Sequence, residues 1–439
     1  MSDETADPKF WDLQQYKTDT VETVADSLPK RKLRMHFDGN ASVLFWVALK
    51  SVIFTILTAG IYRFWMVTRL RRFYWGAIRI DGDPLEYTGR GIEKLLGFLL
   101  ALVVLAIYLG AVNLGLTFAG LSLASDDPFI LNATLNLTIL AALPFIYYAI
   151  YRGQRYILAR TRWRGIRFAL APGAWGYVGR AILLTLLTVV TLGLAYPYQQ
   201  FKLAKYITDR AYFGDQKFEQ HGSWTELFTQ WVWIYIIGGL GGVVIWGIVE
   251  NAGSGGAGFV AGLLLSVLFM AFLIVVYRYQ IAAFKILWSN KALGKARFEN
   301  DLVPGRVLGI MVGGSVAVGL VVAVLGTLIF LAIFGIIGAV MDPEAAAAFQ
   351  SSDGQLTPEM FAQAWPVFLL VLIGYLLVLG LAFAFSQIFV TLRVLRTQVE
   401  GMIVIDPDAL AAAQQRAHDA SAEAGGFADA LGVDIGAGV

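Results

Sequence analysis

The sequence predicts an all-α polytopic membrane protein that carries small β-hairpin arms on its cytoplasmic side. Of its 439 residues, 57% are hydrophobic and only 15% are charged, whereas soluble domains typically have about 25% charged residues. The mean hydropathy of +0.64 requires an apolar solvent, and a lipid bilayer provides one. A third observation, the uneven placement of Lys and Arg along the chain, sets the expected topology.

Eight apolar stretches lie between two polar tails. A helix needs about 20 residues to cross a bilayer at a rise of about 1.5 Å per residue, and most of the stretches are long enough. They cover residues 43–60, 95–123, 135–151, 175–195, 228–249, 258–277, 307–341 and 365–392.

Lys and Arg are absent from three long tracts, 95–151, 218–277 and 307–392, each of which holds two apolar stretches and a turn. Short loops without Lys and Arg are generally the exported ones. The intervening arms are basic, and residues 152–167 alone contain six Arg. We therefore expect three transmembrane helical hairpins, with the basic arms and both termini in the cytoplasm.

The stretches 43–60 and 175–195 have basic arms on both sides, so a full crossing would export one arm. Both contain the same interruption, Thr58-Ala59-Gly60 and Thr191-Leu192-Gly193, and glycine often marks the break of a helix. We expect two re-entrant or interfacial half-helices that pack inside the bundle, because non-helical backbone at membrane depth must be buried or hydrated. The alternative is eight ordinary crossings with some arms exported.

The two tails have compositions that cannot bury a core of their own. Residues 1–34 are charged and mostly polar, and residues 406–439 are rich in Ala and Gly. We expect both to be disordered cytoplasmic tails, and no signal peptide is expected because the start lacks a basic segment followed by an apolar one. The membrane domain would then cover 35–405, with internal repeats at about 36–167, 168–297 and 298–405.

A basic residue followed by an aromatic or apolar one recurs in four arms, and we call this pair the landmark. Each pair lies twelve residues before an apolar position, and a glycine lies between the pair and that position. In the first arm this glycine belongs to Asp81-Gly82, a dipeptide that favours a tight hairpin turn. Several such hairpins could join into a small cytoplasmic sheet. A weaker fifth copy contains Arg396. The pairs are Arg72-Phe73, Arg155-Tyr156, Lys205-Tyr206 and Lys285-Ile286, and the apolar positions are Leu85, Phe168, Phe218 and Phe298.

The landmarks have two interpretations. As topological anchors, their basic residues would face lipid phosphates while the aromatic rings lie at the interface. Alternatively they form a phospholipid or nucleotide site, since arginine recognises phosphate well. The expected partners are anionic lipid headgroups, and the residues concerned are Arg72, Phe73, Arg155, Tyr156, Lys205, Tyr206 and Lys285.

Each half-helix holds one cation, Lys50 in the first and Arg180 in the second. Ionisable residues at membrane depth usually mark functional sites. In the simpler alternative, both cations snorkel to the cytoplasmic interface. The hypothetical substrate or headgroup site consists of Lys50, Thr58, Gly60, Arg180, Thr191 and Gly193.

The sequence contains no recognisable catalytic chemistry. It has no cysteine, which excludes thiolate nucleophiles and Cys-ligated metals, and its three histidines, His36, His221 and His418, lack metal-ligand spacing. A Ser-His-Asp set and a phosphate-binding loop are also missing. We expect no enzyme activity, no cofactor, no metal site and no nucleic-acid partner.

Residues 37–82 contain a set of aromatic, glycine and arginine residues at characteristic spacing: Phe37, Gly39, Thr58, Gly60, Ile61, Tyr62, Trp65, Arg69, Arg71, Arg72, Phe73, Tyr74 and Asp81-Gly82. With these residues the chain resembles the YjgN-like family of bacterial inner-membrane proteins of unknown function. That family typically has proline before the motif tryptophan, where this chain has Phe64, although Tyr196-Pro197-Tyr198 keeps a proline. The resemblance extends over about 36–405 and implies a multi-pass inner-membrane protein without a known activity.

Two functional hypotheses follow from this organisation. Repeats combined with interrupted helices are typical of transporter folds, which favours transport or conduction of a small solute. The alternative is a non-transporting membrane organiser or assembly factor, whose basic cytoplasmic arms bind anionic lipid or a partner protein.

Overall fold

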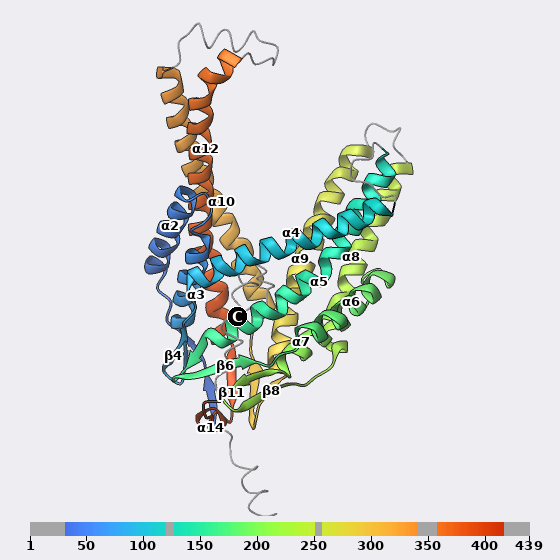
Figure 1. Ribbon diagram of the computed structural model, residues 1–439, viewed down its shortest axis with the longest axis vertical. Coiled ribbons are helices and arrows are strands. Elements are labelled where there is room, and N and C mark those ends of the chain that lie inside the picture. The colour runs from blue at the N-terminus through green and yellow to red at the C-terminus, as the bar shows by residue number, and fades with distance from the viewer. Residues whose placement is uncertain (1–30, 120–126, 251–256, 341–357, 417–439) are drawn as a thin grey trace, which may run out of the picture.

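The computed structural model describes residues 31–119, 127–250, 257–340 and 358–416. Long helices rise from one eleven-stranded sheet (Figure 1). The predicted polytopic helical membrane protein is confirmed, because five helices in the described ranges are long and apolar enough to cross a bilayer. These candidate spans are Gly91–Phe118, Trp224–Ile248, Gly262–Ser289, Pro304–Ile336 and Trp365–Glu400.

Four β-hairpins of equal size make up most of the sheet, each with a strand of three residues followed by a strand of five. Asp81-Gly82 forms the first turn, as the sequence predicts, and Gly82 has a φ of +86°, which glycine adopts without strain. The all-α classification is wrong, because the hairpins pair edge to edge into one large sheet. They are β3 (Ile78–Ile80) with β4 (Asp83–Tyr87), β5 (Thr161–Trp163) with β6 (Ile166–Leu170), β7 (Ala211–Phe213) with β8 (Gln216–Gln220), and β9 (Lys291–Leu293) with β10 (Ala296–Asn300).

The two ends of the chain close this sheet. Strand β11 (Met402–Ile405) pairs with β10 and with β1 (Lys32–Arg34), while β2 (His36–Phe37) pairs with β3. Only Met35 separates β1 from β2, so one short segment joins both ends of the strand order into a ring.

Parts of both predicted tails belong to this folded unit. Besides β1, the short helix α14 (Asp408–Ala411) follows β11, and the Gln414 carbonyl accepts a bond from the Asp215 amide in the β7–β8 turn (2.8 Å). The predicted tail boundaries at residues 34 and 406 are therefore corrected. Residues 1–30 and 417–439 lie outside the described part of the chain.

Every helical pair leaves the sheet and returns to it, since the strand before each pair is hydrogen-bonded to the strand after it. Both ends of each pair therefore lie at the same sheet. The last pair continues through a π-helical turn, η1 (Gln387–Thr391), into α13 (Leu392–Glu400). The pairs are α2 (Ala41–Leu57) with α3 (Arg63–Ala77), α4 (Gly91–Phe118) with α5 (Pro128–Arg160), α6 (Ala174–Val190) with α7 (Tyr196–Thr208), α8 (Trp224–Glu250) with α9 (Ala257–Ser289), and α10 (Pro304–Val340) with α12 (Pro358–Ser386).

The helices follow one another around the ring, and α12 packs against α2 to complete it. Away from the sheet the pairs diverge, with α10 and α12 on one side of Figure 1 and α8 and α9 on the other. Within an apolar 18-residue window of each candidate span, at most 17% of the residues are buried by the protein itself. The apolar surfaces of the spans are therefore left for the bilayer to cover.

Aromatic side chains fill the ring of strands. Phe213 is fully buried, and its ring centroid lies 4.8 Å from that of Phe168 and 5.7 Å from that of Trp163. Phe218 in turn lies 6.4 Å from Phe168 and 6.2 Å from Phe298. Three of the apolar positions that follow the landmarks, Phe168, Phe218 and Phe298, thus share one core, where aromatic contacts add to the gain from burial.

Replacing Phe213 with alanine is expected to lower the free energy of unfolding by about 3–5 kcal/mol, because a cavity would replace a fully buried ring. Lys217→Ala, at an exposed position of the neighbouring strand, is the matched control and should change it by less than about 0.5 kcal/mol. Denaturant unfolding in detergent measures both values. Equal losses in the two variants would show that Phe213 does not stabilise the ring.

Candidate functional site

Three of the four basic landmark residues, Arg72, Arg155 and Lys205, are hydrogen-bonded to carbonyls at or just beyond the ends of sheet strands. Arg155 is 5% exposed, and its Nε donates to the carbonyl of the last residue of β6 (3.1 Å). Lys205 Nζ donates to the carbonyl of the last residue of β8 (2.6 Å), and Arg72 Nη2 donates to the Gly89 carbonyl just beyond β4 (3.2 Å). These bonds fasten three of the helices that return to the sheet, α3, α5 and α7, to the hairpins that follow them.

The aromatic landmark residues also lie within the protein. Tyr156 is fully buried and donates from its hydroxyl to Glu93 (2.9 Å), while Tyr206 is 8% exposed and donates to the Gly173 carbonyl (2.9 Å). Phe73 and Lys285 are half-buried. The burial of Arg155, Tyr156 and Tyr206 corrects their expected position at the lipid interface.

The N-terminal segment completes the weak fifth copy at Arg396. Its Nη2 donates to the Gly39 carbonyl (3.0 Å), and its guanidinium lies 5.8 Å from the centroid of the Phe37 ring. Arg72 bonds Gly89 in the same way, and in both cases the glycine stands two residues before a helix, α2 or α4. The fifth arm is thus assembled from the two ends of the chain.

A second set of cations lies three residues before the landmarks and before Arg396. These cations belong to the helices that return to the sheet, α3, α5, α7 and α13, which we call the descending helices. Each is within 6.0 Å of the centroid of an aromatic ring, and no carboxylate in the described part of the chain forms an ion pair with them. Arg152 is half-buried and the other three are exposed. We call this set the neck cations: Arg69, Arg152, Lys202 and Arg393, which face Tyr62, Tyr148, Tyr198 and Phe389.

The sequence interpretation missed the neck cations. Their signal is a basic residue at a fixed distance before the landmark in arms one, two, three and five, whereas arm four has Ala282 at that place. A cation beside an aromatic ring at the end of a membrane helix is typical of an interfacial anchor.

The two interrupted turns have the same backbone. Ala59 and Leu192 have φ values of +49° and +51°, and the glycines after them both have +92°. In each turn the threonine Oγ1 accepts a bond from the amide four residues later, at 2.9 Å for Thr58 and 3.1 Å for Thr191. Gly60 and Gly193 thus provide the left-handed conformation, and the threonine hydroxyls are engaged in building the turns.

Lys50 and Arg180 are both exposed, but they lie on separate helical pairs. The Arg180 Nη1 donates to the Gly176 carbonyl (2.9 Å), and its guanidinium lies 4.8 Å from the centroid of the Tyr206 ring. Helix α2 packs against α3 and α12, whereas α6 packs against α5 and α7, on the opposite side of Figure 1. The structure therefore does not bring Lys50, Thr58 and Gly60 together with Arg180, Thr191 and Gly193.

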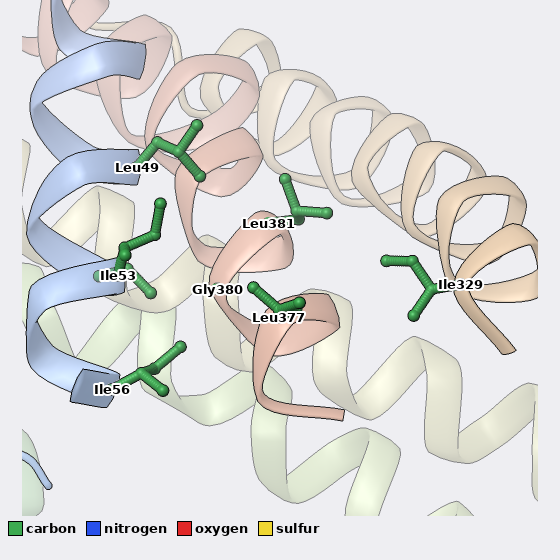
Figure 2. Close-up of a pocket in the computed structure, with 8 residues that line it drawn as sticks. Leu49, Ile53, Ile56, Ile329, Leu377, Gly380 and Leu381 are labelled. Atoms are coloured by element: carbon green, nitrogen blue, oxygen red, sulfur yellow. The ribbon is translucent and has the colours of Figure 1, made fainter. Parts of the chain in front are cut away.

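A small cavity of about 120 Å³ lies between α2, α10 and α12 (Figure 2). Gly380 lets α12 approach α2 closely, because a Cβ at this position would lie 2.7 Å from Cγ1 of Val52. The side chains around the cavity are all apolar, and burying a polar group without a partner costs free energy. The cavity therefore suits an acyl chain. They are formed by Leu49, Val52, Ile53, Ile56, Ile329, Leu377, Gly380 and Leu381.

No cluster of His, Asp or Glu suited to a metal ion occurs in the described ranges.

Two comparisons place the chain among known proteins. Residues 32–430 match the family described as bacterial protein of unknown function (DUF898). The chain belongs to this family. It is also similar to the inner membrane protein YjgN of Escherichia coli O157:H7, with 26% identity over 160 residues, or 36% of each chain. No solved structure matches.

The match to YjgN covers little more than a third of that relative. Together with the apolar helices, it supports an inner-membrane location for this member of the family. The resemblance to the YjgN-like family is confirmed.

Lys291, the first residue of β9, gives a testable pH dependence. Burial lowers the pKa of Lys291 to about 7, and its Nζ lies 3.5 Å from the centroid of the Trp288 ring. Between pH 7 and the usual lysine pKa of 10.5, the folded protein binds fewer protons than the unfolded chain, so stability rises with pH.

We expect Lys291→Met to raise the unfolding midpoint most at or below pH 7 and to flatten its pH dependence between about pH 7 and 10. Thermal unfolding across this range is the measurement. Lys295→Met, at an exposed turn residue, should keep the wild-type slope. If the unfolding midpoint of Lys291→Met keeps the wild-type dependence on pH, the pKa of Lys291 is not lowered in the folded protein.

Proposed function

We propose that this inner-membrane protein organises lipid. It binds anionic phospholipid headgroups at the neck cations and holds bilayer lipid between its diverging helical pairs, without transporting a solute. The observation that carries this proposal is the occurrence of four cation–aromatic pairs at one corresponding place on four descending helices.

The neck cations supply charge that is not used inside the protein. The landmark cations Arg72, Arg155 and Lys205 donate to backbone carbonyls, whereas the neck cations have no carboxylate partner in the described ranges. A Lys or Arg near an anionic leaflet contributes about 1 kcal/mol to binding. A ring of such residues would therefore favour anionic lipid around the sheet.

Transport of a small solute is the second candidate. The matching turns at Gly60 and Gly193 favour it, because interrupted helices form the sites of many transporters. Three observations weigh against it: the cavity beside α2 has hydrocarbon walls, aromatic rings fill the sheet, and the two half-helix cations lie apart. The organiser is therefore the function that the geometry supports better.

We further propose that α2–α3 and α6–α7 enter the bilayer without crossing it. Helices α2 and α6 have 17 residues each, or about 26 Å, which is less than the hydrocarbon core of about 30 Å. Beside the first turn, the Phe64 and Phe98 ring centroids lie 5.3 Å apart. At the second, Trp231 Nε1 donates to the Gly193 carbonyl (3.1 Å).

Phe98 and Trp231 show how far from the sheet each turn meets the neighbouring long helix. Both residues lie seven positions beyond the start of that helix, α4 or α8. Seven residues correspond to about 10 Å along the helix axis. Both turns therefore sit beside the sheet-proximal part of a candidate span, which favours re-entrant or interfacial pairs.

Because the sequence has no cysteine, single introduced cysteines can test this topology. Ala59→Cys and Leu192→Cys, at the two turns, are expected to resist a membrane-impermeant thiol reagent added to intact cells. Asp127→Cys, exposed before α5, should react, and Asp215→Cys, in an exposed sheet turn, should not. Labelling at residue 59 or 192 as fast as at residue 127 would establish a full crossing.

Charge neutralisation tests the lipid-binding proposal. The triple variant Arg69→Gln, Lys202→Gln, Arg393→Gln should weaken the preference for phosphatidylglycerol over phosphatidylcholine by at least tenfold, since each charge contributes about 1 kcal/mol. Lipid titration of the purified protein, followed by native mass spectrometry, measures this preference.

The matched control replaces three exposed sheet cations, Lys217, Lys295 and Arg297, with glutamine. This variant changes the net charge equally and should keep the wild-type preference. If both variants lose it to the same extent, overall charge rather than the neck determines binding, and the proposed function fails.

A further inference from the structure

The two interrupted turns share a backbone but differ in what covers them. At the second turn, Tyr235 Oη donates to the Leu192 carbonyl (2.6 Å), and Trp231 Nε1 donates to the Gly193 carbonyl (3.1 Å). Both donors come from α8. Tyr235 satisfies the Leu192 carbonyl, which has no backbone donor in the described residues, as is required of backbone at membrane depth. Trp231 adds a second bond to the Gly193 carbonyl, which also accepts from the Tyr196 amide (3.0 Å).

The first turn lacks these donors. Phe98 and Leu102 lie seven and eleven residues into α4, as Trp231 and Tyr235 do in α8, and neither carries a hydrogen-bond donor. No side-chain donor from the described part of the chain reaches the carbonyl of Ala59 or Gly60. A Cβ added at Gly60 would have nothing within 4 Å, so this turn is open.

Arg63 adds a positive charge at the open turn. It is the first residue of α3, it is exposed, and it forms no ion pair with the described carboxylates. The corresponding residue at the second turn is Tyr196, whose ring centroid lies 4.6 Å from that of Trp231. At the first turn, therefore, the Ala59 carbonyl has no donor in the described residues, and the Gly60 carbonyl accepts only from the Arg63 amide (3.1 Å), beside the Arg63 guanidinium. At the second turn both corresponding carbonyls have a side-chain donor, and a tyrosine takes the place of the arginine.

Hydrocarbon surface continues from this turn along α2. Leu57 and Ile61, on either side of the turn, are 74% and 55% exposed. Ile56, one turn of helix before Ala59, is part of the cavity wall that also includes Leu377 and Gly380 of α12 (Figure 2). An occupant that satisfies all of these surfaces needs a donor, an anion and an acyl chain.

We propose that the first turn binds a phospholipid whose headgroup carries both a primary ammonium and a phosphate. The ammonium donates to the carbonyls of Ala59 and Gly60, the phosphate accepts from Arg63, and an acyl chain occupies the cavity between α2, α10 and α12. This site deepens the proposed lipid-binding function and rests on it. Phosphatidylethanolamine has these groups, whereas phosphatidylcholine has no N–H and phosphatidylglycerol has no ammonium.

Grafting the second turn's cover onto the first tests the site. Phe98→Trp with Leu102→Tyr would supply the missing donors from the protein itself. Titration of the full purified chain with each of the three lipids, followed by native mass spectrometry, is the measurement. Wild type should bind one phosphatidylethanolamine roughly tenfold more tightly than phosphatidylcholine, as expected for hydrogen bonds to a charged group, and the graft should abolish that difference.

Two further variants separate the parts of the site. Arg63→Gln removes the phosphate contact common to all three lipids, so it should weaken each of them severalfold. The reciprocal change on α8, Trp231→Phe with Tyr235→Leu and Tyr196→Arg, should create a second site that prefers phosphatidylethanolamine. Unchanged thermal unfolding midpoints would exclude misfolding as the cause of either result.

A grafted variant that keeps the wild-type preference for phosphatidylethanolamine would overturn this site, as would a wild type that binds the two lipids equally. Neither result bears on the neck cations. Their contribution is measured as the loss of the preference for phosphatidylglycerol in the triple variant at Arg69, Lys202 and Arg393. If that variant loses anionic lipid while the graft changes nothing, the turn site fails and the proposed function stands.

Discussion

Hydrogen bonding between the two ends of the chain, at β1 and β11, is the constraint on which the remaining structure depends. It closes the sheet, so that each helical pair begins and ends at neighbouring strands of one ring. All basic arms are thereby held at the same sheet, including those next to the short pairs α2–α3 and α6–α7. Closure also joins the two end strands of the order, β1 and β2, through Met35, so that the sheet does not end in two separate edges of the kind that promote edge-to-edge association. The aromatic rings around Phe213 then fill the interior of this ring.

The basic residues divide into two groups with different physical roles. A buried guanidinium must be hydrogen-bonded, and Arg155 meets this requirement by donating to the carbonyl at the end of β6. The partly exposed Lys205 donates to the carbonyl at the end of β8 and pairs with Asp209 (3.1 Å). One turn earlier, Arg152 and Lys202 lie beside tyrosine rings without a carboxylate partner in the described residues. The first group fixes the helices to the sheet, while the second leaves charge for the membrane surface. The proposed function depends on this division.

The interrupted turns show how one backbone can take on different roles. Gly60 and Gly193 have the same conformation, so the difference between the turns comes from the neighbouring long helix and from one position in the turn. Where α8 offers Trp231 and Tyr235, the turn is complete within the protein. Where α4 offers apolar side chains and Arg63 replaces the tyrosine, the turn remains open to an external partner. The proposed headgroup site follows from that contrast.

The sequence by itself determined the membrane class, the positions of the long apolar helices, both interrupted turns and the spacing from landmark to strand. These features depend on hydropathy and turn propensity, which are local in sequence. Only the tertiary structure decided that the hairpins close into a ring, that Arg396 bonds Gly39 across 357 residues, and that Arg155 is buried. It also placed Lys50 far from Arg180 and put Arg63, just beyond the first apolar stretch, at an open turn. Such partners are chosen by proximity in space once the chain has closed, and local composition carries no record of that choice.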